Sequence, residues 1–188
     1  MPTPALNSGN VRVAGTGAIW KAPLGTVLPI DSTTAWGTGF VNLGYATDGF
    51  SLKQSLKKQS ITAWQTLSSV RSIVTELIRS LTFEALESNI NTVPLAFGGA
   101  TMTPGLAGIY TLDIPDGQLD DFILGVDWSD GTRTQRIVVQ QASLLSLPEM
   151  KFVRTDAVRY PLEVEALKPA DGTKAILVYG VDSGVSGV

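Results

Sequence analysis

Residues 122–139 read FILGVDWSDGTRTQRIVV, and this stretch determines the expected fold class. Its two halves are rich in β-branched and aromatic residues, as paired strands usually are. Between them lies the dipeptide Asp130-Gly131, which suits a tight hairpin because both residues tolerate a positive φ angle. The stretch therefore predicts a β-hairpin.

The same dipeptide occurs three more times, at Asp48-Gly49, Asp116-Gly117 and Asp171-Gly172. Before the last of these, residues 162–166 alternate between apolar and acidic side chains, which predicts a half-buried strand. After it, residues 175–179 are apolar throughout and predict a central partner strand. Repeated hairpin signals of this kind indicate a mainly β, antiparallel fold.

Two neighbouring segments have a weaker pattern. Residues 52–67 alternate loosely between polar and apolar side chains and predict a long, exposed hairpin. Residues 70–87 carry apolar side chains at helical spacing, yet many of these residues are β-branched and favour strands. The periodicity of residues 70–87 alone favours a helix.

A short helix is expected between Ser88 and Gly98. Ser88 and Asn89 can cap its first amide groups, and the pair Gly98-Gly99 can end it. Pro94 requires the helix to be short or to begin late, because proline cannot donate a hydrogen bond inside a helix.

The composition indicates a protein that associates with itself and has no active site. The 188 residues suit one domain, 1–188, with flexible arms at 1–12 and 180–188. Charged residues make up 16%, against ~25% in ordinary globular domains. The chain has no Cys and no His, which excludes Ser-His-Asp and Cys-His catalysis and the usual zinc ligands. We therefore expect no enzymatic activity, no cofactor and no metal.

The net charge of −3 is distributed unevenly. Residues 100–131 carry six Asp and no basic residue, whereas the rest of the chain is slightly positive. This overall charge argues against specific binding of nucleic acid. The residues at 1–10 lack the basic start and apolar run of a secretory signal, and no window has the ~18 to 20 apolar residues that span a bilayer.

Several residues were weighed as ligands or catalysts. The acidic run 113–121 offers oxygen ligands, but its spacing does not match a calcium loop, so an acidic turn is the simpler interpretation. Glu163 and Glu165 share a strand face and favour a solvated surface over a glycosidase pair. Core positions are favoured over intermolecular anchors for Trp20, Trp36, Trp64 and Trp128.

Beyond these local patterns, the order of motifs along the chain resembles that of bacteriophage major tail proteins of the long-tailed, non-contractile type. The likeness begins with AGTGAIWKAPLGTVLPID at 14–31 and LGYATDG at 43–49. It continues through Ala63-Trp64, Val70-Arg71 and LTFEALESN at 81–89, and so covers nearly the whole chain.

This resemblance implies two packed antiparallel sheets forming a sandwich or barrel like that of tail and secretion tubes. One flanking helix and a long hairpin complete the implied fold, and residues 70–87 become strands. In that family, six subunits form a ring, and rings stack into a hollow tube that conducts double-stranded DNA without binding it specifically. The implied partners are further copies of the chain, the tape-measure protein, the tail terminator and distal tail proteins. The implied locations are the virion and, during assembly, the host cytoplasm.

Within this interpretation, two sets of residues acquire expected roles. Acidic side chains would line the lumen and repel DNA phosphates, and the candidates are Asp113, Asp116, Asp120 and Asp121. A hairpin would bridge stacked rings together with the two termini, and its candidate residues are Lys53, Lys57, Lys58 and Trp64. The alternative function is a β-sandwich module that binds carbohydrate or acts as an adhesin through exposed Trp and Asp side chains.

Overall fold

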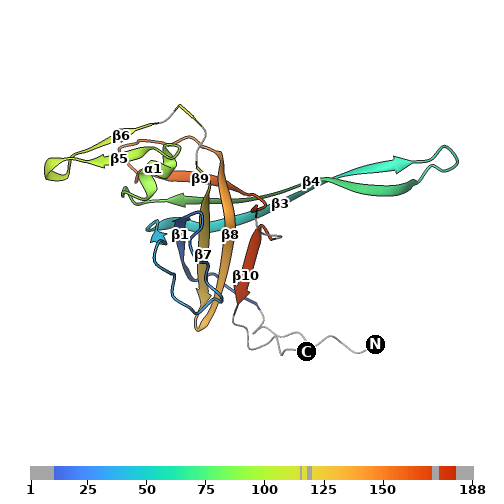
Figure 1. The fold of residues 1–188 in the computed structure, drawn as a ribbon, viewed down its shortest axis with the longest axis horizontal. Coiled ribbons are helices and arrows are strands. Elements are labelled where there is room, and N and C mark those ends of the chain that lie inside the picture. The colour runs from blue at the N-terminus through green and yellow to red at the C-terminus, as the bar shows by residue number, and fades with distance from the viewer. Residues whose placement is uncertain (1–10, 115, 118–119, 171–173, 181–188) are drawn as a thin grey trace.

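The computed structural model describes residues 11–114, 116–117, 120–170 and 174–180 (Figure 1). Within these residues, antiparallel strands predominate and one short α-helix lies among them. The elements are β1 (Thr16–Pro23), β2 (Val41–Asn42), β3 (Ala46–Thr62), β4 (Ser69–Ala85), α1 (Thr92–Ala96), β5 (Thr101–Pro104), a 3-10 turn (Leu106–Gly108), β6 (Tyr110–Asp113), β7 (Phe122–Asp130), β8 (Arg133–Ser146), β9 (Tyr160–Ala166) and β10 (Ile176–Gly180).

The strands form two antiparallel sheets, as the sequence predicts. The large sheet has the order β2-β1-β7-β8-β9-β4-β3, and β10 adds to β8. β8 is long enough for β10 to pair with residues 135–139 and for β9 to pair with residues 142–146. The second sheet consists of β5 and β6, and it packs on the main core through Met102 and Leu112. The predicted mainly β fold with one helix and a long hairpin is confirmed.

The β7–β8 hairpin lies at the centre of the molecule and is buried on both faces. Leu124 and Val126 point into the main core with side chains from β1, β4 and β9. Ile123 and Val138 point the other way, into a smaller core under the loop that joins β1 to β2. The predicted hairpin at residues 122–139 is confirmed, with Gly131 at φ 60° in the first turn position.

A buried ion pair fastens the β1–β2 loop to the sheet. Arg136 is 3% exposed, and its Nε donates to Asp127 Oδ1 at 2.7 Å. The Arg136 Nη1 atom donates to the backbone oxygens of Asp31 and Thr34, while its guanidinium stacks over Trp36 at 4.1 Å. The backbone N–H of Thr34, and to a smaller extent that of Thr33, donates a hydrogen bond to the Asp31 carboxylate. These bonds lower the pKa of Asp31 to about 2. The β1–β2 loop is thus held to the sheet by charge-assisted hydrogen bonds from Arg136. Loss of this side chain would leave the loop oxygens of Asp31 and Thr34 without these donors.

Trp36 occupies a space that only glycine at position 125 leaves open. A Cβ atom at Gly125 would lie 2.1 Å from Trp36 Cη2. We therefore expect Gly125→Ala to lower the free energy of unfolding by about 1–3 kcal/mol, because the ring must shift. Gly37→Ala, in the same loop, meets only an ordinary 3.8 Å contact and is the matched control. Urea unfolding of both variants measures the difference, and equal stabilities would contradict this packing.

The helix forms where the sequence predicts it. The Asn89 Oδ1 atom accepts from the backbone N–H groups of Asn91 and Thr92, at 2.9 Å each, and so caps the first turn. Pro94 is tolerated because α1 has only five residues, so its missing N–H falls in the first turn. The Thr92 hydroxyl is buried and donates to the Leu43 oxygen at 2.7 Å, which ties the helix to the core.

Three local predictions are wrong or need correction. Asp48-Gly49 is not a hairpin turn but lies inside β3, where Gly49 at φ 78° forms a bulge. Asp116-Gly117 lies in the connection between β6 and β7, which do not pair with each other. Residues 175–179 are not a central strand: β10 pairs with β8 alone and is half-exposed. Asp171-Gly172 lies outside the described residues.

The predicted arms fall mostly outside the described residues. Of the N-terminal arm 1–12, only Val11 and Arg12 are described, and both precede β1. Of the C-terminal arm 180–188, only Gly180 is described, and it is the last residue of β10.

Candidate assembly interface

The most prominent surface feature is the hairpin of β3 and β4. The two strands pair from Ala46 and Ala85 in the body to Thr62 and Ser69 near the tip. Beyond the body they project as a two-stranded ribbon, drawn in cyan to green in Figure 1. We call residues 52–79 the hairpin arm. The predicted hairpin at 52–67 is therefore corrected: that segment is one strand and the turn, and the second strand is β4, as the family resemblance implies.

One face of the hairpin arm carries exposed apolar side chains, interrupted by the Gln54–Arg79 pair. Leu52 lies opposite Leu81, which is fully buried, and Leu56 lies opposite Leu77. Past a bulge, Val74 continues the same face. We call Leu52, Leu56, Val74 and Leu77 the hairpin stripe; their exposures run from 36 to 54%. Because the stripe continues the core outward without a covering layer, it has the character of an interface.

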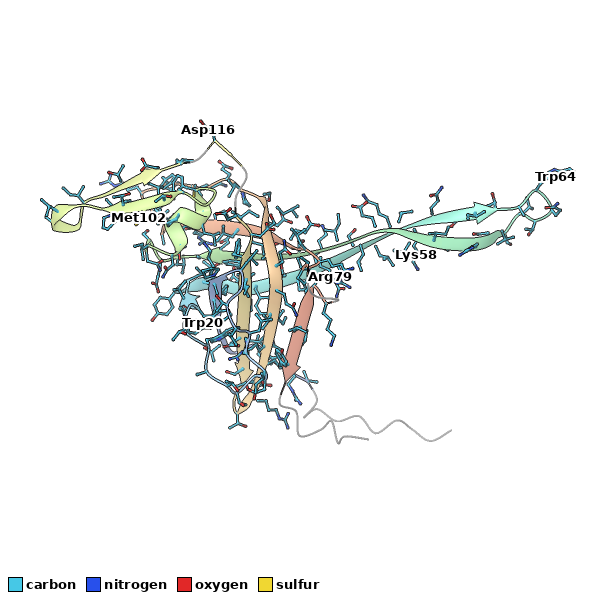
Figure 2. All side chains as sticks on the ribbon, viewed as in Figure 1. Trp20, Lys58, Trp64, Arg79, Met102 and Asp116 are labelled. Carbon is cyan, nitrogen blue, oxygen red and sulfur yellow. The ribbon has the colours of Figure 1, made fainter. Side chains whose placement is uncertain are left out.

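The hairpin arm is also basic. It carries five basic residues and one acidic residue, namely Lys53, Lys57, Lys58, Arg71 and Arg79 against Glu76. Lys57 pairs with Glu76 at 2.7 Å, but both side chains are well exposed, so this ion pair stabilises little. Lys58 lies opposite Val74, and Arg79 lies between Leu77 and Leu81, so both basic residues share the face of the hairpin stripe. Figure 2 shows Lys58 midway along the hairpin and Arg79 near the body.

Trp64 lies at the hairpin tip and is 96% exposed, so its predicted core position is wrong (Figure 2). The neighbouring Leu67 is equally exposed. The other three tryptophans, Trp20, Trp36 and Trp128, are half-buried against the sheet. A large aromatic side chain at the end of a projecting ribbon suits an anchor for another molecule.

The acidic segment lies at one end of the body, where β6 connects to β7. Asp113, Asp116 and Asp120 are exposed, and Figure 2 shows Asp116 at the outer edge of this connection. Asp121 is half-buried and accepts a hydrogen bond from Gln141 Nε2 at 2.7 Å. Among the described residues, none of these four carboxylates forms an ion pair. Asp113, Asp116 and Asp120 present their carboxylates to solvent.

An open groove borders the same segment. It measures about 920 Å³ and lies between the end of β1, α1 and the start of β7. Apolar side chains form about half of its wall, and they include Leu24, Val41, Ile90, Pro94 and Phe122. Asp120 and Asp121 add negative charge, and the Asp121 Oδ1 atom is buried without a hydrogen-bond partner in the described structure. Lys21 Nζ lies 5.2 Å from the Phe122 ring, and burial lowers the pKa of this lysine.

The sequence alone did not reveal this groove or the full basic face. Lys21, Leu24 and Ile90 are far apart in the chain, and no motif joins them. Arg71 and Arg79 were missed because their segment has helical periodicity. The many β-branched residues of this segment, 70–87, were the signal that could have identified it as a strand.

The other candidate residues form no reactive constellation. Glu163 and Glu165 lie on β9 and are half-exposed, and Glu163 Oε2 accepts from the Ser146 hydroxyl at 2.7 Å. Across the described ranges, no three carboxylates gather as a metal site. In the same part of the chain, no helix is long and apolar enough to cross a membrane.

These features define a β-protein with a projecting hairpin and exposed apolar and charged surfaces that are suited to association. The family model for phage tail tube proteins matches residues 4–184. The chain therefore belongs to the phage tail tube protein family, and it is a structural protein of the virion. No curated protein matches the chain.

Proposed function

We propose that this subunit closes into hexameric rings, and that the rings stack into the hollow tube of a long, non-contractile phage tail. The tube conducts double-stranded DNA during ejection. The observation that carries the proposal is the uncovered, projecting hairpin on a member of the tail tube family. β3 supports ring closure as well, because it is a 17-residue edge strand, and an open edge of that length favours pairing with another chain.

The hairpin arm bridges one ring to the next in this proposal. Lys53, Lys57, Lys58 and Trp64 are the contact residues, and the two terminal arms join them. The exposed stripe beside these residues supports this role, because stable interfaces bury apolar surface behind a polar rim.

The lumen is lined in part by the acidic segment in this proposal. Asp113, Asp116, Asp120 and Asp121 repel phosphate, so the DNA slides rather than adheres. The absence of any described ion pair to these four residues supports the role. The tape-measure protein, the tail terminator and distal tail proteins are the remaining partners, and assembly takes place in the host cytoplasm.

Electron microscopy of the purified full chain at rising concentration tests the assembly. Rings or tubes of uniform diameter are the expected result. Dispersed monomers at all concentrations, with measurable affinity for sugars, would replace this function with a carbohydrate-binding one.

Reversing the lumen charge should slow DNA release. In phage carrying Asp113→Lys with Asp116→Lys, we expect ejection to slow by about tenfold at low salt and to recover as salt rises, because screening weakens contacts with phosphate. The control is Asp48→Lys with Glu149→Lys, which makes the same change of charge at exposed sites outside the acidic segment. Fluorescence of released DNA follows the rate. Equal slowing by both pairs of substitutions would place the acidic segment away from the DNA path.

A further inference from the structure

We infer that the groove bounded by β1, α1 and β7 is the receptor for the hairpin tip of another copy of this chain, with Trp64 as the inserted anchor. This inference rests on the proposed self-assembly and names the surface that the hairpin contacts.

The groove has the size and chemistry to hold such an anchor. Its volume of about 920 Å³ falls within the ~300–1,000 Å³ range of sites that bind compact ligands. Exposed Leu24 and Ile90 form its rim, and Phe122 lies in its wall. An indole entering between them would bury apolar surface on both sides.

The hairpin tip has the complementary chemistry. Trp64 is 96% exposed and offers an apolar ring with a single N–H donor. The residues between 56 and 74 carry Lys57, Lys58 and Arg71 and no acid. The groove supplies the carboxylates of Asp120 and Asp121, including the buried Asp121 Oδ1 atom that lacks a donor. Charge and hydrogen-bonding capacity thus match between the two surfaces.

The geometry requires that tip and groove come from different copies. In Figure 1 the hairpin tip projects from one side of the body, while α1, which borders the groove, lies on the other side. A contact between two different surfaces of identical subunits is head to tail, and such a contact propagates to form rings or filaments. Repeating the contact between tip and groove therefore adds one subunit after another to the assembly.

Cysteine cross-linking tests the contact directly, because the chain has no Cys of its own. Gln65→Cys places a thiol beside Trp64, and Ile90→Cys places one on the groove rim. When the two single variants are mixed, assembled and oxidised, we expect a disulfide-linked dimer. The matched control pairs Gln65→Cys with Val178→Cys, an exposed site on β10, and should give no dimer.

Charge exchange provides a second readout. Arg71 pairs with Ile61 and is the basic residue nearest the tip. Arg71→Glu alone and Asp120→Lys alone should each raise the protein concentration needed for tube growth by about tenfold, and the double variant should restore it. Trp64→Ala should raise it by about 30-fold or more, as for an interface hot spot. Tubes that form normally without the Gln65–Ile90 cross-link and without rescue would overturn the inference while leaving the proposed function intact. If the unmodified chain forms no tubes, both are overturned.

Discussion

Replacing residues 54–79 with a two-residue Asn-Gly turn is expected to yield a folded subunit that no longer builds tubes. Lys53 and Ser80 are directly paired, so the cut removes both strands at the same height and leaves the buried Leu81 in place. Most apolar side chains removed are already exposed in the subunit, and Ile78 and Ala63 are half-buried, so the core loses little. Thermal unfolding should therefore remain cooperative, while electron microscopy should show no tubes.

The cut must be symmetric for this result to be interpretable. Removing residues 53–66 alone would delete most of β3 and leave residues 69–79 of β4 without a paired strand, so a loss of assembly could follow from misfolding alone. Unchanged tube length and growth by the shortened subunit would refute the bridging role of the hairpin arm.

The second large effect concerns the buried ion pair. Arg136→Met is expected to lower the free energy of unfolding by about 3–5 kcal/mol. It removes the charged partner of Asp127, which keeps only the Trp36 Nε1 donor, and it leaves two loop oxygens without their donor. For a chain of this length, that corresponds to a fall in melting temperature of about 6–20 °C. Calorimetry measures it.

Arg159→Met is the matched control. Arg159 pairs with Glu84 and Asp156 at 3.5 and 3.0 Å, but all three side chains are about half exposed. Water screens such pairs, so the expected loss of stability is much smaller than for Arg136→Met. A similar loss of unfolding free energy in both variants would show that the burial of Arg136 does not make its contacts more stabilising.

The central hairpin and the short helix were predictable because local chemistry determines them. Gly131 supports the turn of the hairpin at residues 122–139. Asn89 caps the short helix, and Pro94 limits its length. The hairpin arm was not predictable from periodicity, because its side chains face no core of their own chain. Without that constraint, residues 70–79 need not alternate, and their spacing matched a helix by chance.

The functional surfaces were predicted only in part. The basic residues of β3 and the acidic segment are visible in the sequence, since charge does not depend on the fold. Trp64 was assigned to a core because large aromatic residues usually lie there. The groove depends on three segments brought together by the sheet order, which no local pattern encodes.

The unsupported ribbon also makes the subunit a reporter of its own assembly state. An isolated pair of strands is only marginally stable in water, so its backbone amides open often in the free subunit. Amide protons on Lys57 or Val74 should then exchange with deuterium far faster than those on Val126. Burial against a neighbour would slow the exchange of the ribbon alone, which distinguishes free subunits from incorporated ones in the same sample.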